Sequence, residues 1–249
     1  MTPLRKLEII AHRGYSGRAP ENTLAALDAA IAVGADSVEF DVQPAACGTP
    51  VLFHDAMLGR TTNGVGPVKR RPLGLLKALD AGSWYAPGFK GEKIPTQEEA
   101  LAHLAGRVRQ VYQDIKGYRE LEDLDRMVEI TRRSEMAQAS IFVSPDWVVM
   151  NHLRRVAPEI RRAYLVESPH RFPEAMDRSA LDGGSLLSME VGLCLEGPER
   201  VLEAVESGVE VVTWTVNDPK VAARALALGI RRVTTDEVEA LLAWREALG

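Results

Sequence analysis

Cysteine is scarce in this sequence, and long apolar runs are missing. Cys47 and Cys194 are too far apart among the 249 residues to form a recognisable metal-binding pair, so we expect two free thiols in a reducing cytoplasm. No stretch approaches the roughly 18 apolar residues that a transmembrane helix needs. The basic pair Arg5-Lys6 leads into only a short apolar run, Ile9-Ile10-Ala11, which argues against a signal peptide. These absences predict a cytoplasmic protein without stable membrane insertion.

An excess of positive charge is also missing. The net charge is −5, from 30 Lys and Arg against 35 Asp and Glu, which argues against a surface for nucleic acid. This balance still permits a locally basic pocket for one phosphate. Hydrophobic residues make up 46% and charged residues 26% of the chain, as in an ordinary globular protein. These features leave the oligomeric state open.

Short β-branched segments alternate with longer helical patterns, which is typical of a parallel sheet. The eight strand candidates are Glu8–His12, Ser37–Val42, Val108–Ile115, Ala139–Val143, Arg162–Val166, Leu186–Met189, Val211–Trp214 and Arg232–Thr235. Examples of helical periodicity are Asn22–Val33, Leu121–Glu135, Pro145–Val156, Pro198–Ser207, Asp218–Leu228 and Val238–Ala247. The alternation and the length predict an α/β fold, a (β/α)₈ TIM barrel forming a single domain over residues 1–249.

One connection breaks this rhythm. Between Val42 and Gln97 lie about 55 residues that are rich in glycine and proline and include a strand-like piece, Pro50–Phe53, whereas ordinary βα connections are far shorter. A TIM barrel carries its active site at the carboxyl ends of its strands. We therefore predict that residues 43–96 form a small inserted subdomain over the barrel mouth.

Acidic side chains gather at two of the predicted strand ends. Because side chains alternate along a strand, Glu39 and Asp41 project to the same side, about 6.5 Å apart. Asp114 and Lys116 repeat this spacing on another strand. Carboxylates this close repel one another by several kcal/mol in a partly buried site, unless a cation lies between them. Oxygen ligands favour a hard divalent ion such as Mg²⁺ or Ca²⁺.

Two histidines lie where they can flank a ligand at this mouth. His12 ends the first predicted strand and is followed by Arg13, and His54 follows the apolar run Val51-Leu52-Phe53 in the insertion. Two imidazoles, a cation and the bases Arg13 and Lys116 suit phosphodiester cleavage. Trp214, at another strand end, is expected to contact the ligand by stacking on a cationic or glycerol group. Asn22 is expected to act as a helix N-cap.

The ordered set of motifs closely resembles the glycerophosphodiester phosphodiesterase family over nearly the whole chain. The matching segments are His12-Arg13-Gly14, Pro20-Glu21-Asn22-Thr23, Gly34 to Asp41, Val51-Leu52-Phe53-His54-Asp55, Arg60-Thr61-Thr62, Gly91 to Thr96, Asp114-Ile115-Lys116, Trp214-Thr215-Val216-Asn217 and Thr235-Asp236. The resemblance implies a barrel with one divalent cation that releases glycerol 3-phosphate and an alcohol such as choline or ethanolamine. The family usually has Glu where Asp114 stands, so this ligand is one methylene shorter here.

The resemblance also implies roles for several of the matching residues. His12 and His54 would form the acid/base pair, and Glu39, Asp41 and Asp114 would bind the metal. Arg13 and Lys116 would hold the phosphate, and Glu21 would line the same site. The partner would be a small glycerophosphodiester such as glycerophosphocholine or glycerophosphoethanolamine, and no nucleic acid.

Several alternatives remain open. The phosphorus could be attacked by a glycerol hydroxyl, which gives a cyclic phosphate, or directly by water. A phospholipase C/D-like phosphodiesterase on the same fold would need an apolar rim, for which the insertion offers Trp84, Tyr85 and Phe89. A phosphate-ligand binding module without turnover is the non-enzymatic alternative.

Overall fold

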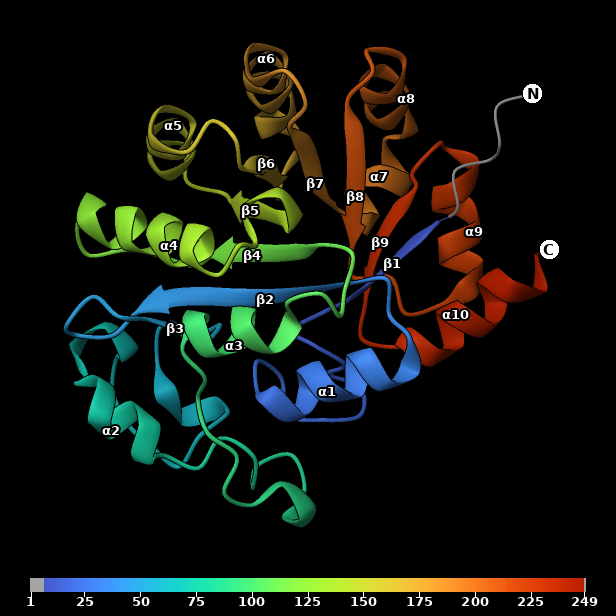
Figure 1. Ribbon diagram of the computed structural model, residues 1–249. Coiled ribbons are helices and arrows are strands. Elements are labelled where there is room, and N and C mark those ends of the chain that lie inside the picture. Colours follow the sequence, from blue (N-terminus) through green and yellow to red (C-terminus); the bar gives the residue numbers. More distant parts are fainter. Residues whose placement is uncertain (1–6, 249) are drawn as a thin grey trace.

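The computed structural model describes residues 7–248, so the basic pair Arg5-Lys6 lies outside the described residues. Eight parallel strands form a closed barrel with helices around it (Figure 1). The barrel strands are β1 (Glu8–Ala11), β2 (Ser37–Pro44), β4 (Val111–Ile115), β5 (Ser140–Ser144), β6 (Arg161–Val166), β7 (Leu186–Glu190), β8 (Glu210–Trp214) and β9 (Arg232–Thr235). The predicted TIM barrel is confirmed.

The barrel closes because β1 pairs with both β9 and β2. Ile10 is in register with Thr234 on one side and with Ser37 on the other. The remaining order runs β9, β8, β7, β6, β5, β4 and β2, with each neighbouring pair parallel. The carboxyl ends of all eight strands therefore meet at one mouth.

At least one helix follows each barrel strand along the chain. They are α1 (Leu24–Val33), α3 (Gln97–Leu104), α4 (Leu121–Arg133), α5 (Trp147–Val156), α6 (Phe172–Asp182), α7 (Val191–Glu196), α8 (Pro198–Glu206), α9 (Pro219–Ala227) and α10 (Val238–Ala247). Side-chain caps fix several starts; Thr96, for example, forms a capping box with Glu99 at α3. The prediction that Asn22 caps the first helix is wrong. Thr23 is the N-cap of α1, because the Asn22 side chain instead bonds to Asp41.

Alternation along the strands separates two apolar layers. The larger layer packs between the strands and the helices and includes Val38, Phe40 and Val42 of β2. The smaller layer fills the barrel interior and includes Ile10, Tyr112 and other inward-facing residues. Glu39 and Asp41 alternate with the outer layer of β2, so they face the interior near the mouth.

Residues 43–96 contain short elements around a small core of their own. The elements are β3 (Pro50–Leu52), the 3₁₀ helices η1 (Leu58–Arg60), η2 (Val68–Arg70) and η3 (Pro87–Phe89), and α2 (Leu73–Ala78). β3 pairs antiparallel with the end of β2, Val42 lying opposite Leu52. A separate apolar cluster that includes Val51, Phe53 and Leu58 is buried here. In Figure 1 this segment lies to one side of the barrel, next to the carboxyl end of β2.

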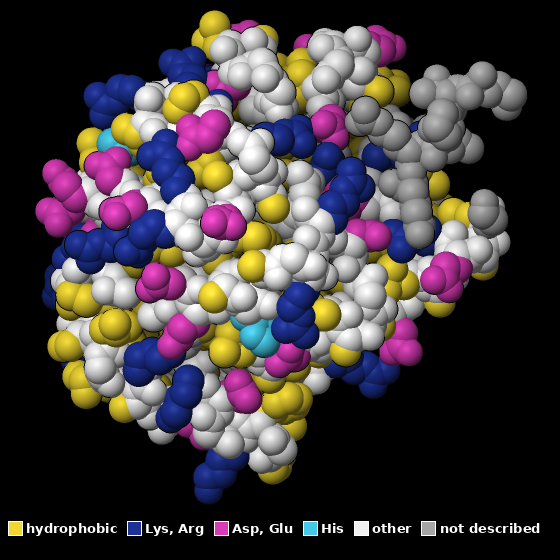
Figure 2. Space-filling view, viewed as in Figure 1, with side chains coloured by type: hydrophobic (Ala, Val, Ile, Leu, Met, Phe, Trp, Pro, Cys, Tyr) yellow, Lys and Arg dark blue, Asp and Glu magenta, His cyan; other side chains and the backbone are white. Residues whose placement is uncertain are grey.

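Charged side chains of both signs are interspersed on the face shown in Figure 2. Cys47 is exposed and Cys194 is buried, and both are free thiols, as predicted. Within residues 7–248, no helix is both long and apolar enough to cross a membrane.

Candidate active site

A cavity of about 210 Å³ opens at the carboxyl ends of the strands. Its walls bring together side chains that follow or end most of the barrel strands. The residues that line it are His12, Arg13, Glu39, His54, Tyr112, Asp114, Lys116, Val143, Leu165, Glu167, Ser188, Val212, Trp214, Thr215 and Thr234. Most of the residues predicted from the sequence as site residues therefore share one cavity.

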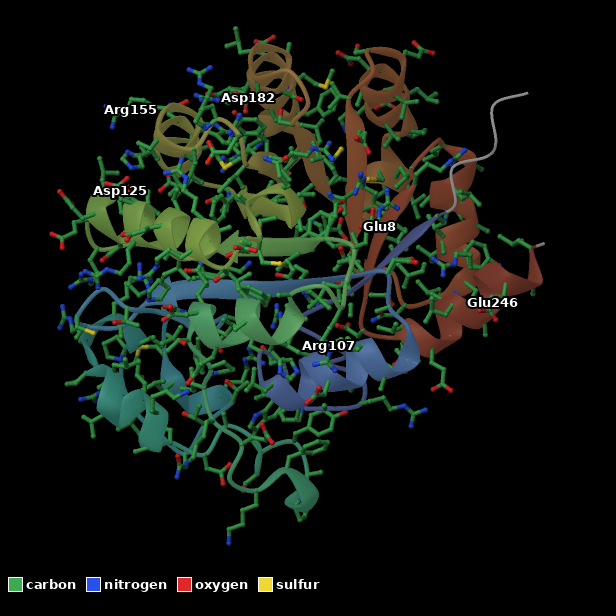
Figure 3. The ribbon with its side chains drawn as sticks, viewed as in Figure 1. Glu8, Arg107, Asp125, Arg155, Asp182 and Glu246 are labelled. Atoms are coloured by element: carbon green, nitrogen blue, oxygen red, sulfur yellow. The ribbon has the colours of Figure 1, made fainter. Side chains whose placement is uncertain are left out.

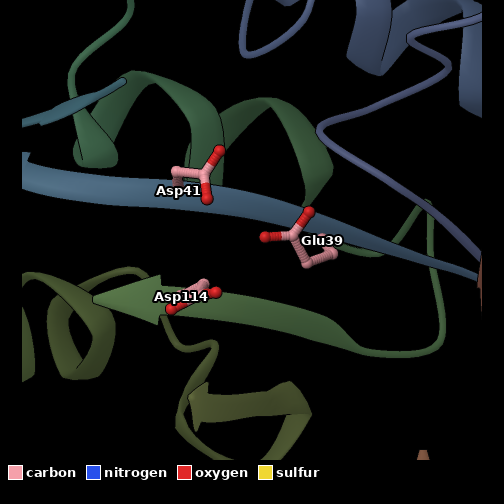
Figure 4. Close-up of side chains that lie close together, drawn as sticks. All are labelled: Glu39, Asp41 and Asp114. Carbon is pink, nitrogen blue, oxygen red and sulfur yellow. The ribbon is translucent and has the colours of Figure 1, made fainter. Parts of the chain in front are cut away.

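Three buried carboxyl groups form its acidic centre. Asp41 of β2 is directly in register with Asp114 of β4, and Glu39 lies two residues before Asp41. One oxygen from each group lies within 4.8 Å of the other two, and Figure 4 shows the three groups close together. Each of the three residues is less than 8% exposed. This cluster fits a divalent cation, since hard ions prefer several carboxylate oxygens.

The negative charges of the three carboxyl groups repel one another as long as no cation binds between them. Burial, followed by repulsion from Asp41, raises the pKa of Glu39 to about 8. Burial likewise raises the pKa of Asp114, although Lys116 opposes this. Burial would also raise the pKa of Asp41, but Lys116 and Arg13 hold it below its usual value. The buried Oδ1 of Asp114 has no hydrogen-bond partner within the described chain, which leaves a free donor atom for an ion.

Two bases flank the acidic centre. The Nζ of Lys116 lies 2.6 Å from Asp114 and 3.3 Å from Asp41. The guanidinium of Arg13 lies 3.2 Å from Asp41 and 2.7 Å from Glu21. Both bases also line the cavity. Their binding of a phosphate stays a prediction.

The loop after β1 is held in an unusual backbone conformation. Arg13 and Asn22 both have positive φ, 55° and 58°, which side chains other than glycine adopt rarely and at some cost in energy. The Arg13 amide donates to Glu39 at 2.8 Å. The Asn22 amide group donates to Asp41 at 2.7 Å and its carbonyl accepts from the Asp41 backbone at 3.0 Å. These bonds fix two of the three carboxyl groups.

His12 is oriented by an aspartate from the far end of the chain. Its Nδ1 lies 2.7 Å from Asp236, which follows β9 and also accepts from Ser16 and Asn217. Burial alone would lower the pKa of His12, but the Asp236 hydrogen bond and the nearby Glu39 outweigh it, so that this pKa is raised. Since Nδ1 is engaged, Nε2 is the ring nitrogen left for proton transfer.

His54 has a similar partner in the insertion. Its Nδ1 lies 2.7 Å from Asp55, and Arg60 binds the same carboxylate at 2.7 Å and 3.1 Å. The Arg60 hydrogen bonds lower the pKa of Asp55 to about 2. Arg60 also makes two bonds of 2.7 Å to Glu21. It therefore ties the loop after β1 to the carboxylate that holds His54.

Glu21 does not itself line the cavity. Its carboxylate is bound by Arg13 and Arg60, and it borders a smaller neighbouring hollow with Asn22. Its direct contact with substrate stays a prediction, as do the individual roles of the other site residues. His103, His152 and His170 lie outside the cavity, as expected; His152 bonds to Asp125 on α4, which is labelled in Figure 3.

The sequence predicts no individual role for Asp236, Arg60 and Glu167. Asp236 directly follows β9 and Glu167 directly follows β6, so the rule that found His12 and Asp114 could have found both. The linking role of Arg60 has no such signal, because its partners are set by the fold of the insertion.

Known proteins share this fold and these motifs. The Glycerophosphoryl diester phosphodiesterase family profile matches residues 12–240. A glycerophosphodiester phosphodiesterase from Caldanaerobacter subterraneus subsp. tengcongensis is 31% identical over 241 residues, covering 95% of this chain and 97% of the relative. Among solved structures, an Oleispira antarctica phosphodiesterase in complex with the product sn-glycerol-3-phosphate has a TM-score of 0.87 at 30% identity, covering 97% of each chain. A glycerophosphodiester phosphodiesterase from Agrobacterium tumefaciens has a TM-score of 0.82 at 28% identity, covering 95% of this chain and 99% of that one. The chain therefore belongs to the glycerophosphodiester phosphodiesterase family and is a phosphoric diester hydrolase.

Proposed function

We propose that this protein hydrolyses small glycerophosphodiesters, such as glycerophosphocholine or glycerophosphoethanolamine, to glycerol 3-phosphate and an alcohol. The observation that carries the proposal is one cavity lined by two carboxylate-bound imidazoles, two bases and members of a buried tricarboxylate cluster. The Oleispira relative, which holds the product sn-glycerol-3-phosphate, supports the same class of substrate.

The two histidines divide the proton transfers. Asp236 raises the pKa of His12 and thereby favours its protonated form, so we assign His12 as the acid that protonates the leaving alcohol oxygen. His54 is accordingly assigned as the base that removes the proton from the attacking hydroxyl. The Nδ1 of each ring is held by a carboxylate, so both transfers use Nε2. Acid/base groups of this kind contribute about 10²- to 10⁴-fold each.

Arg13 and Lys116 position the phosphate and offset its charge. Glu39, Asp41 and Asp114 would hold a divalent cation, Mg²⁺ or Ca²⁺ by ligand type, which when bound withdraws charge from the phosphoryl oxygens. Trp214 lines the same cavity at the end of β8 and provides an aromatic face for the glycerol or the alcohol. The Asp114 side chain is one methylene shorter than the usual glutamate, which favours weaker binding of the ion or a shifted ion position.

Two nucleophiles fit this arrangement. The neighbouring glycerol hydroxyl would attack within the same molecule, an entropically favourable route to a cyclic phosphate that water then opens. Attack by water on the diester would give the products in one step. Rapid quenching followed by ³¹P NMR distinguishes the routes, because only the first passes through the cyclic phosphate.

The test is hydrolysis of glycerophosphocholine, with choline and glycerol 3-phosphate measured in the presence of Mg²⁺, Ca²⁺, Mn²⁺ or EDTA. We expect release with at least one cation and none with EDTA. His12→Ala and His54→Ala should each lower kcat by about 10²- to 10⁴-fold. His103→Ala, which lies on α3 away from the cavity, is the matched control. Binding of glycerophosphocholine without any product would instead support a non-catalytic binding module.

A further inference from the structure

The cavity has a second acidic position, outside the tricarboxylate cluster. Glu167 directly follows β6 and lines the cavity. Around the closed barrel, β6 is four strands away from β1 in either direction. Glu167 is therefore diametrically across the mouth from His12, which directly follows β1.

The wall from Glu167 to His12 by way of β7, β8 and β9 carries no charge, whereas the wall by way of β4 and β2 includes Asp114, Lys116 and Glu39. Val143, Leu165 and Val212 contribute apolar surface on β5, β6 and β8, and Ser188 adds a hydroxyl on β7. Trp214 ends β8, two strands away from Glu167. Glu167 thus lies across the mouth from Arg13, which follows β1, and Trp214 lies across from Lys116, which follows β4.

The surroundings of Glu167 leave its carboxylate open to a ligand. Within residues 7–248, its carboxylate takes part in no hydrogen bond or ion pair, and the side chain is exposed. The nearest bases in sequence are engaged elsewhere: His170 contacts Ser168, whereas Arg171 bonds to the Pro145 carbonyl and lies 4.1 Å over the Trp147 ring. By contrast, Asp41 and Asp114 form ion pairs with Arg13 and Lys116. The negative charge of Glu167 is therefore available to a ligand.

We infer that Glu167 and Trp214 form a subsite that selects substrates whose leaving alcohol carries a positive charge. A quaternary or primary ammonium group would contact the Trp214 ring face and the Glu167 carboxylate while the phosphate lies at Arg13 and Lys116. Alcohols that are neutral or anionic lose this attraction or are repelled. This inference rests on the proposed hydrolysis of glycerophosphodiesters and names the class of alcohol that the same site prefers.

The expected effect is moderate, because Glu167 is exposed. Interactions between solvent-exposed opposite charges change an equilibrium by up to about fivefold, and a cation–aromatic contact adds a comparable factor. The preference should weaken at high salt, since screening shortens the range of such attractions to about 3 Å at 1 M.

The experiment compares kcat/KM for glycerophosphocholine with kcat/KM for glycerophosphoglycerol, whose leaving alcohol is neutral. Glu167→Gln should lower the ratio of the two values about three- to fivefold, mainly through KM for the choline substrate, and Glu167→Lys should lower it further. Glu206→Gln removes the same charge from an exposed position on α8 and should leave the ratio unchanged. Raising the salt concentration should reduce the wild-type ratio toward that of Glu167→Gln.

Two outcomes would overturn the inference, and they differ in whether they also refute the proposed function. A ratio unchanged in both Glu167 variants, with wild-type hydrolysis of both substrates intact, refutes the cation subsite and leaves the proposed function standing. Failure of the wild-type protein to hydrolyse either substrate with any of the cations refutes the proposed function together with the subsite.

Discussion

Glu39→Gln should stabilise the metal-free protein while removing its response to metal. Burial and Asp41 raise the pKa of Glu39 from 4.5 to about 8. Between these two values, the folded protein keeps a proton that the unfolded chain has lost. The free energy of unfolding therefore falls by about 1.4 kcal/mol for each pH unit across this window. At pH 7 the accumulated loss is about 3 kcal/mol, and Glu39→Gln abolishes it because an amide does not titrate.

The assay is urea or thermal unfolding in EDTA between pH 5 and 9. The wild-type protein should lose stability steadily as the pH rises from 5 to 8, and Glu39→Gln should show a flatter profile and be about 3 kcal/mol more stable at pH 7. Adding Mg²⁺, Ca²⁺ or Mn²⁺ at pH 8 should stabilise the wild-type protein, since the ion binds the folded state and replaces the proton. The variant should gain much less. Glu203→Gln, an exposed change on α8, is the control.

Parallel pH profiles for the wild-type protein and Glu39→Gln in EDTA would refute the reasoning. They would mean that Glu39 is ionised at low cost in the folded protein. The three carboxyl groups would then not repel one another strongly in the absence of an ion. An undiminished metal response in the variant would contradict the assignment of Glu39 as a ligand.

Three further changes test the supports of the site. Asp236→Asn removes the charge that raises the pKa of His12, so kcat should fall by at least about 10²-fold and the alkaline limb of the pH–rate profile should move to lower pH. Arg60→Met frees the carboxylates on either side of it and should lower kcat by about tenfold, with less effect on KM, whereas Arg60→Lys should restore part of it. Gly14→Ala should destabilise the fold by about 2 kcal/mol or more, because φ is +76° and the new Cβ would lie 2.6 Å from the α1 backbone. Gly74→Ala, which has open space, should leave the melting temperature within about 2 °C of the wild-type value.

The barrel and its acidic centre could be predicted because both depend on local periodicity. Alternation along β2 places Glu39 and Asp41 on the inner face, and a parallel sheet brings the end of β4 beside them. These relations hold whatever the loops do. The insertion is different, since its short helices show no long amphipathic pattern and its internal contacts join segments far apart in sequence.

Hydrogen bonds between side chains far apart in the sequence account for the features of the site that could not be predicted. Asn22 is a residue type that often caps helices and lies just before α1. Its amide group nevertheless pairs with Asp41, 19 residues away, and Thr23 is the N-cap. The link between Arg60 and Glu21 spans 39 residues. Local propensity contains no information on such pairings, so only the folded structure shows them.

The bond between His12 and Asp236 has a consequence for the growing polypeptide. It spans 224 residues and joins the end of the first strand to the residue after the last one. A nascent chain that has emerged from the ribosome only through β4 already contains Glu39, Asp41 and Asp114, but it lacks Asp236, whose carboxylate orients His12. The bond can therefore form only when synthesis is almost complete, at the stage at which β9 can pair with β1 and close the ring of strands.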